Sequence, residues 1–322
     1  MKALKIAGKV LLYILVTVIL LLLLLRLGVT VFYFDYFNHS ESEFLIPGLT
    51  SAWVPQGFDY VEEDGVYLMS GYMSDGTASR VYVRNENGDT HYVELKNEDD
   101  TDYTRHSGGV CQNGEFVYIA GKNGVEVFRY DDFRSDGFAT NVGTIEADYS
   151  IAYCTFYNGY LLAGNFYYPE TYETPAEHRI ITPAGDANTA LIIIYKADET
   201  AEFGIDPNPV AAISTSGKVQ GICFTSDEEI VLSTSYSVSS SHLYYHRIDL
   251  SRSATITVCG TEVPLFYLDS ATLTDTLTLP PMAEELVCKD GRVYVMCESA
   301  CNKYIFGKFI RGYQVFSYSA DE

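Results

Sequence analysis

Residues 54–72 read VPQGFDYVEEDGVYLMSGY, which combines a short apolar strand, a turn and a second apolar strand. The same order of small residues, strand, turn and strand returns four more times along the chain. Self-similar units at such spacing indicate a repeat architecture rather than a chain of unrelated elements. The other units read HSGGVCQNGEFVYIAGK (106–122), SIAYCTFYNGYLLAGNFY (150–167), KVQGICFTSDEEIVLSTSY (218–236) and PMAEELVCKDGRVYVMCES (281–299).

A third strand follows every unit, and a fourth follows most of them. Four antiparallel strands per repeated unit are typical of a β-propeller blade. The sequence therefore predicts an all-β propeller of five four-stranded blades, or of six if residues 251–280 hold an irregular blade. The third strands are SRVYVRN (79–85), GVEVFRY (124–130), ALIIIYK (190–196), HLYYHRIDL (242–250) and GYQVFSY (312–318), and the fourth are THYVEL (90–95), ATNVGTIEA (139–147), NPVAAIST (208–215) and TDTLTL (274–279).

The fifth unit has no fourth strand, because the sequence ends at Glu322. A strand of suitable character, SEFLIPGL (42–49), precedes the first unit instead. We therefore predict that this N-terminal strand completes the last blade and closes the ring.

The N-terminal segment is apolar enough to cross a membrane. Val10 to Leu25 contains no charge, Arg26 interrupts the run, and apolar residues continue to Phe34. About 20 such residues span the core of a bilayer, and Arg26 can extend its charge to the interface. Three lysines precede the run, so the positive-inside rule predicts a cytoplasmic N-terminus. The alternative, a cleaved signal peptide, lacks a small-x-small cleavage site here.

These features divide the chain into four parts. Residues 1–9 form a basic cytoplasmic flank, 10–34 a transmembrane signal-anchor helix, 35–41 a short linker, and 42–322 an extracytoplasmic propeller. The predicted location is therefore the cell membrane, with a single pass.

The charge is distributed unevenly around this division. The net charge is −22, but residues 35–322 contain 17 basic and 43 acidic side chains and so carry −26. An acidic surface repels phosphates, which argues against nucleic acid as a partner. The 47% of hydrophobic residues argues against disorder, because such a chain can bury enough apolar surface to offset its ordering entropy.

A set of short runs carries a family resemblance. The runs are VPQGF (54–58), HSGGV (106–110), KVQGICF (218–224), STSYSVSSSHLYYH (233–246), PPMAEELV (280–287) and ESACNKY (298–304). In this order and spacing they resemble a family of secreted or membrane-tethered bacterial β-propeller-like proteins, over most of residues 45–305. The resemblance implies an extracytoplasmic propeller and brings no reaction with it. A weaker likeness to calcium-dependent lactonase and arylesterase propellers involves no residue-by-residue match, so no role is transferred from them.

Candidate site residues follow from blade symmetry. The inner strands of a propeller line its central channel, and the loops before them share one face with the loops between second and third strands. Polar side chains at these positions are therefore expected to converge. Catalytic candidates are His106, Glu284 and Glu285, and the last two are also the metal-ligand candidates. Ligand-binding candidates are Gln56, His106, Asn165, Tyr168, Tyr172, Gln220, Tyr236, Glu298 and Lys303.

The seven cysteines do not suggest a disulfide framework. Cys111, Cys154, Cys223 and Cys288 occupy the same place on four inner strands, where Asp59 stands in the first. Equivalent positions on different blades are expected to lie beyond disulfide reach. Cys297 and Cys301 are close enough in sequence to pair, which the sequence leaves open.

Three functions compete at this level. The preferred prediction is a membrane-anchored binding protein that holds a small molecule, peptide or glycan, or a protein, at the channel mouth. The second is a hydrolase or lactonase with Ca²⁺ or another divalent ion in the central channel. The third is a scaffold in an envelope complex. The sequence contains no zinc-protease, nucleotide-binding or nucleophile-elbow motif that would favour another enzyme class.

Overall fold

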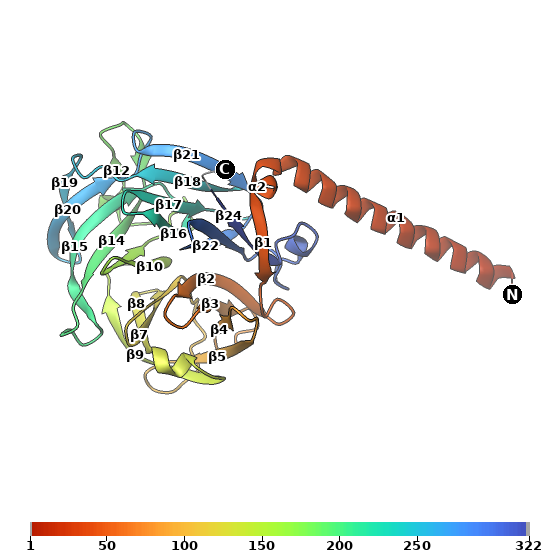
Figure 1. Ribbon diagram of the computed structural model, residues 1–322, viewed down its shortest axis with the longest axis horizontal. Coiled ribbons are helices and arrows are strands. Elements are labelled where there is room, and N and C mark those ends of the chain that lie inside the picture. The colour runs from red at the N-terminus through yellow and green to blue at the C-terminus, as the bar shows by residue number, and fades with distance from the viewer. Residues whose placement is uncertain (1, 320–322) are drawn as a thin grey trace.

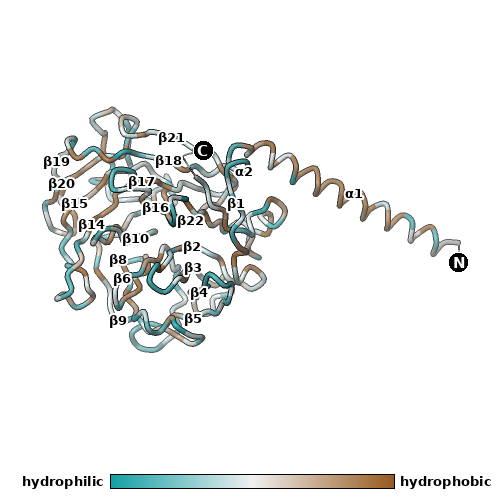
Figure 2. The backbone as a smooth tube through the Cα atoms, viewed as in Figure 1, coloured by the Kyte–Doolittle hydropathy of each residue, from teal (hydrophilic) through white to brown (hydrophobic). Residues whose placement is uncertain are grey.

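The computed structural model describes residues 2–319 and shows an N-terminal helix attached to a β-propeller (Figure 1). Helix α1 (Lys2–Phe32) extends away from the ring, and a short helix α2 (Phe34–Asn38) follows it. Residues 5–32 of α1 are long and apolar enough to cross a membrane, and none of its best apolar window is buried. The tube in Figure 2 is correspondingly apolar along most of α1, whereas apolar and polar residues alternate in the ring.

The strands pair into five groups of four, in which successive strands are antiparallel neighbours. The inner strand of each group lies near the middle of the ring and the fourth strand near its perimeter (Figure 1). The first group contains β2 (Trp53–Val61), β3 (Val66–Met73), β4 (Arg80–Asn85) and β5 (Thr90–Lys96), and the second contains β6 (Val110–Asn113), β7 (Phe116–Gly121), β8 (Gly124–Arg129) and β9 (Gly137–Glu146).

The remaining groups follow the same order. The third contains β10 (Tyr153–Tyr157), β11 (Tyr160–Gly164), β14 (Ala190–Ala197) and β15 (Ile205–Thr215), and the fourth contains β16 (Val219–Ser226), β17 (Glu229–Thr234), β18 (Ser241–Arg247) and β21 (Leu273–Leu279). The last contains β22 (Ala283–Lys289), β23 (Arg292–Cys297), β24 (Gln314–Tyr318) and β1 (Ser40–Leu45). Short 3₁₀ turns are η1 (Tyr130–Phe133), η2 (Ala176–His178) and η3 (Phe306–Lys308).

The predicted closure of the ring by an N-terminal strand is confirmed. Strand β1 pairs antiparallel with β24, from Ser40 opposite Tyr318 to Leu45 opposite Gln314. The ends of the folded ring therefore hold each other, and the outer edge of β24 is covered. An uncovered edge would expose a row of unpaired backbone groups.

Residues 251–280 do not form a sheet of their own. Strands β19 (Ala254–Val258) and β20 (Thr261–Tyr267) make a hairpin, and β20 pairs in parallel with β15 of the third group. Strand β5 pairs in parallel with β9 in the same manner, which merges the first two groups into one eight-stranded sheet. Because such contacts merge neighbouring groups, the number of blades stays a prediction.

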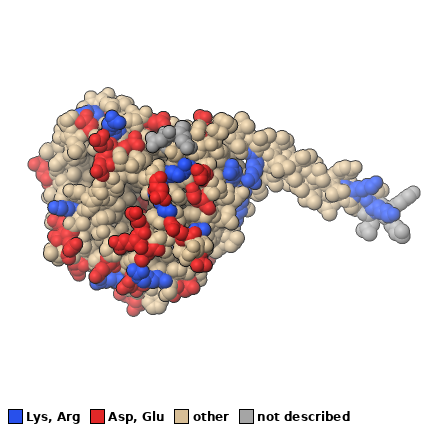
Figure 3. Space-filling model, viewed as in Figure 1, with Lys and Arg blue, Asp and Glu red and all other residues tan. Residues whose placement is uncertain are grey.

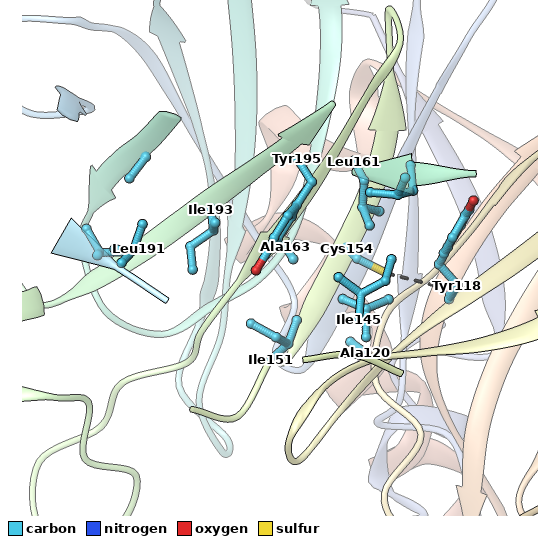
Figure 4. Packing of buried hydrophobic residues seen from close by; sticks show 14 of the residues in the cluster. Tyr118, Ala120, Ile145, Ile151, Cys154, Leu161, Ala163, Leu191, Ile193 and Tyr195 are labelled. Atoms are coloured by element: carbon cyan, nitrogen blue, oxygen red, sulfur yellow. Dashed lines mark hydrogen bonds between the residues drawn. The ribbon is translucent and has the colours of Figure 1, made fainter. Parts of the chain in front are cut away.

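The core fills the spaces between groups. One cluster joins the second and third groups through residues such as Tyr118, Cys154, Leu161 and Tyr195, and Figure 4 shows Cys154 and Leu161 between the two tyrosines. All seven cysteines are free thiols. The Sγ atoms of Cys111 and Cys154 lie 3.8 Å apart, so the expectation that equivalent inner-strand cysteines stay far apart is wrong for this pair. The inner strands converge so tightly around the channel that neighbouring side chains touch.

The segment 35–41, predicted to be a short linker, contains most of α2 and the first residues of β1. Tyr36 is buried against the fourth and fifth groups, where its ring meets Phe316 with centroids 5.9 Å apart. Tyr33, between the two helices, and Phe37 of α2 join Tyr36 in the same cluster, so these three aromatic side chains attach α2 to the folded ring.

Candidate functional site

The carboxylate of Glu285 occupies the centre of the ring. Its Oε2 accepts hydrogen bonds from the backbone N–H of Phe58 at 2.9 Å and of Val110 at 2.8 Å. Its Oε1 accepts one from the N–H of Cys154 at 3.0 Å. One side chain of the last group thus binds the inner strands of the first three groups.

Two glycines leave the space that Glu285 needs. A Cβ atom on Gly109 would lie 2.3 Å from Oε1 of Glu285, and one on Gly221 would lie 2.3 Å from its Cα. Only glycine permits such close approach of backbone to a neighbouring residue. The inner strand of the fourth group therefore touches Glu285 through Gly221, and all five groups meet at this residue.

The surroundings of Glu285 favour an anchor over a metal ligand. Burial raises the pKa of Glu285, and the three backbone N–H donors oppose that rise. N–H donors bind anions, whereas a metal ion needs lone pairs directed at it. In residues 2–319, no group of three or more His, Cys, Asp or Glu side chains is arranged to hold a metal ion. The donor set at Glu285 therefore does not fit a divalent ion.

Irregular pairing displaces three other side chains near the centre of the ring from the regular ladder. The register of the inner strands shifts between Pro55 and Gly57, between Val219 and Gly221, and between Ala283 and Leu286. The residues inside these shifts are Gln56, Gln220 and the pair Glu284–Glu285. An extra residue in one strand is left out of the ladder and can redirect its side chain, a device common beside functional sites.

These side chains form two amide–carboxyl pairs. Nε2 of Gln56 donates to Oε2 of Glu298 at 3.0 Å, and Nε2 of Gln220 donates to Oε1 of Glu284 at 3.4 Å. Gln56, Glu284 and Glu298 are each at most 9% exposed. Four of the predicted site residues therefore come together at the mouth, although they lie up to 242 positions apart in sequence.

The two carboxyl groups hold protons more tightly than ordinary glutamates do. Burial raises the pKa of Glu298 to about 7, against the opposing effects of Lys303 and of the Gln56 amide. Burial, followed by the nearby Glu298 and Glu285, raises the pKa of Glu284 well above its usual range. Like charges in one low-dielectric site disfavour double ionisation, so the pair carries protons near neutral pH.

Aromatic and basic residues border this pair. The ring of His106 lies against that of Tyr72, with centroids 4.6 Å apart. The Lys303 ammonium bonds to the Tyr72 hydroxyl at 2.5 Å and lies 5.0 Å from the ring centres of both Tyr72 and Tyr304. The surrounding protein and Lys303 lower the pKa of His106, so its imidazole is neutral at pH 7.

A second cluster stands beside the first, at the start of β16 and the loop after β11. Tyr168 stacks on Tyr236, with centroids 3.6 Å apart, and the Lys218 ammonium lies 5.4 Å from the Tyr168 ring centre. Phe166 meets both Tyr172 and Tyr236 through its ring. Because Lys218 lies over the ring of Tyr168 and Gln220 donates to Glu284, the start of β16 joins the two clusters.

The loop that carries the tyrosines has structure of its own. It includes η2 and a small hairpin of β12 (Ile180–Ile181) and β13 (Ala187–Asn188). Asn165 fixes its base, because Oδ1 accepts from the N–H of Leu191 at 2.8 Å and Nδ2 contacts Nδ1 of His178 at 3.0 Å. Asn165 is 2% exposed, so its polar atoms serve the loop and not the mouth.

Sequence reasoning missed four neighbours of this site, namely Tyr72, Phe166, Tyr304 and Lys218. Tyr72 closes the first unit and Lys218 begins the fourth, so the blade symmetry that selected Gln56 and Gln220 could have found both. Tyr304 lies in a loop without a counterpart in the other units, and its place depends on how that loop folds. We call Gln56, Tyr72, His106, Gln220, Glu284, Glu298, Lys303 and Tyr304 the mouth cluster, and Phe166, Tyr168, Tyr172, Lys218 and Tyr236 the aromatic cluster.

Two hollows lie away from both clusters. One of about 290 Å³ is lined by the loop from Asn97 to Arg105 together with residues of β8 and β9. Another of about 640 Å³ lies beside the ends of β17, β18 and β21. Neither contains a residue of the mouth cluster or the aromatic cluster.

Comparison with known proteins yields structural likeness at low sequence identity. No protein-family model matches the chain, and no curated protein matches it. It is similar to the glutaminyl cyclase of Myxococcus xanthus, with 11% identity, coverage of 80% of this chain and 90% of the other, and a TM-score of 0.42. It is also similar to a gluconolactonase of Xanthomonas campestris, with 11% identity, coverage of 87% of this chain and 95% of the other, and a TM-score of 0.41. A third similar structure is the Dos1 propeller, with 9% identity, coverage of 78% of this chain and 59% of the other, and a TM-score of 0.34.

Proposed function

We propose that the protein is anchored in the membrane by α1 and binds a polar, uncharged ligand, a glycan or a peptide, across the mouth and aromatic clusters. The observation that carries this proposal is the pairing of amides with proton-holding carboxyl groups beside a stacked tyrosine pair. Amides and carboxylic acids both donate and accept hydrogen bonds. Tyrosines add large contact area at low entropic cost.

The geometry supports an extended ligand. Tyr172 is 54% exposed, so its ring offers a free surface, whereas Glu284 is 2% exposed and lies deeper. Polar groups at the bottom and aromatic groups at one side are typical of small-molecule and saccharide sites, where a few polar contacts fix orientation. The acidic ectodomain does not disfavour an uncharged ligand, because it exerts no net repulsion on one.

Removing the exposed ring of Tyr172 and the half-buried ring of Tyr168 tests the binding surface. We expect the double variant Tyr168→Ala, Tyr172→Ala to lose at least about tenfold in affinity, since buried aromatic contacts dominate binding energy. The measurement is binding of the full-length protein to a glycan array and a peptide library, with affinities for the hits from titration calorimetry.

The matched control is Tyr160→Ala. Tyr160 is 39% exposed and lies on β11, at the end opposite the loop that carries Tyr168. It should retain native affinity, and all variants should keep the native melting temperature. Equal affinity of the double variant and the native protein for the same hits would overturn the proposed surface.

The raised pKa values of Glu284 and Glu298 favour hydrolysis as a second candidate function. In that case Glu284, the more deeply buried of the two, would act as the general acid and Glu298 as the general base. A base works when deprotonated, so kcat/KM should increase as the pH rises through about 7, the pKa of Glu298.

The test is a panel of esters and lactones assayed between pH 5 and 9, a range that spans about two units on either side of the pKa of Glu298. Glu298→Gln should remove the rising limb and reduce kcat/KM by ~10²–10⁴-fold, the usual contribution of acid–base catalysis. Glu115→Gln, at an exposed glutamate far from the site, should change neither. Absence of turnover across the panel would leave binding as the function.

A further inference from the structure

The loop between β23 and β24 has an unusual charge. The loop, residues 298–313, contains Lys303, Lys308 and Arg311 against one acidic residue, Glu298, whose carboxyl is buried against Gln56. Elsewhere the ectodomain is strongly acidic, as the net −26 of residues 35–322 shows. In Figure 3, basic side chains gather where α1 meets the ring, while acidic ones are spread across the ring. A basic loop on an acidic domain indicates an anionic surface as its neighbour.

The same loop lies against the end of the membrane helix. Nη2 of Arg26, on α1, donates to the hydroxyl of Tyr313 at 3.4 Å. The Arg311 guanidinium lies 4.7 Å from the ring centre of Phe37, on α2. The N–H of Ile46 donates to the carbonyl of Tyr313 at 3.0 Å, which brings the end of β1 alongside. The loop, α2 and the end of β1 therefore share the edge from which α1 leaves.

Large apolar side chains are exposed along this edge. Ile305 is 54% exposed, Phe309 40%, Leu45 63% and Phe34 57%. A soluble domain rarely exposes several such residues together unless they meet a partner. We call Phe34, Leu45, Ile305, Lys308 and Phe309 the edge patch.

The backbone at Ile305 is strained in a way that presents its side chain to solvent. Its φ is +57° with ψ −34°, a conformation that β-branched residues almost never adopt. Such strain is costly and usually persists where it serves function. In the isolated ring no burial of the Ile305 side chain offsets it.

We propose that the edge patch docks on the bilayer surface, with Lys308 at anionic lipid headgroups and Ile305 and Phe309 in the interfacial layer. This inference rests on the proposed anchoring by α1. Apolar side chains flanked by cations are the combination that binds peripheral segments to anionic membranes. The ring then stands on its edge at the membrane, since α1 leaves from its perimeter (Figure 1), and both faces stay open to the medium.

Quenching by brominated lipids tests the contact in the full-length chain. The native Trp53 is fully buried, so it gives a constant background, and Phe309→Trp adds a probe in the patch. The protein is reconstituted into phosphatidylcholine vesicles, with or without phosphatidylglycerol, containing brominated acyl chains. We expect emission of the new tryptophan to fall at least about twofold more in anionic vesicles than that of a matched probe outside the patch.

The matched control is Phe138→Trp. Phe138 is 62% exposed on β9, across the ring from α1 in Figure 1, so its probe should not be quenched. Adding Lys308→Glu to Phe309→Trp should reverse most of the quenching. Equal quenching of the two probes, or none at residue 309 in a chain that stays in the vesicles after carbonate washing, would overturn the docking alone. Release of the chain by carbonate would overturn the anchoring and the docking with it.

Discussion

Replacing Glu285 by alanine should lower the free energy of unfolding by at least about 3 kcal/mol, because three buried N–H groups lose their acceptor at ~1–3 kcal/mol each. Those donors come from the inner strands of three different groups, so the loss loosens the centre of the ring. The measurement is urea unfolding in detergent, followed by the fluorescence of the single, buried Trp53.

Two glutamine variants sharpen this test. Glu285→Gln keeps the volume but directs an NH₂ group at one of the N–H donors, so we expect an intermediate loss. Glu284→Gln serves as the matched control. Burial raises the pKa of Glu284, so its carboxyl is already protonated, and it makes one long hydrogen bond of 3.4 Å to Gln220. This variant should change stability by less than about 1 kcal/mol. A Glu285→Ala variant as stable as the control would show that the ring does not depend on its centre.

Removal of β1 should prevent the ring from folding, whereas removal of α1 alone should not. A chain that begins at Ile46 lacks the strand that covers β24, and it also lacks Phe44 and Tyr36, which are buried in two core clusters. A chain that begins at Tyr33 keeps all of these contacts. Closing strands of this kind hold together elements from the two ends of a chain, and an open edge invites aggregation.

Soluble yield and thermal unfolding monitored by circular dichroism compare the two truncated chains. We expect a cooperative transition for the chain that begins at Tyr33, and aggregation or a non-cooperative profile for the one that begins at Ile46. A shared melting temperature would mean that β1 contributes nothing to closure, in disagreement with its five registered pairs.

The repeat made most of the fold predictable. Each predicted third and fourth strand lies within a few residues of an observed one, such as 190–196 beside Ala190–Ala197. These strands are set by local apolar patterning and by turn residues, both of which are visible in sequence. The closing strand was predictable too, because the last unit lacks a fourth strand and an extra strand precedes the first unit.

The site was predictable in part. Blade symmetry placed Gln56, Gln220 and Glu298 correctly near one another. It did not reveal which of Glu284 and Glu285 would reach the centre. Neighbours on a regular strand face opposite sides, but the register shift between Ala283 and Leu286 turns both inward. Space at Gly109 and Gly221 then admits Glu285 to the channel.

The sequence alone determined the apolar helix, the strand repeat and the set of polar residues at the inner-strand starts, since each depends on neighbours within a few positions. Tertiary structure alone decided the contacts between blades. It joined β20 to the third group, placed Cys111 beside Cys154, and brought Arg311 against Phe37. It also made Glu285 the common acceptor of three strands. Such contacts depend on how closely the backbones of distant segments approach each other. That distance is controlled by the size of the side chains packed elsewhere in the ring.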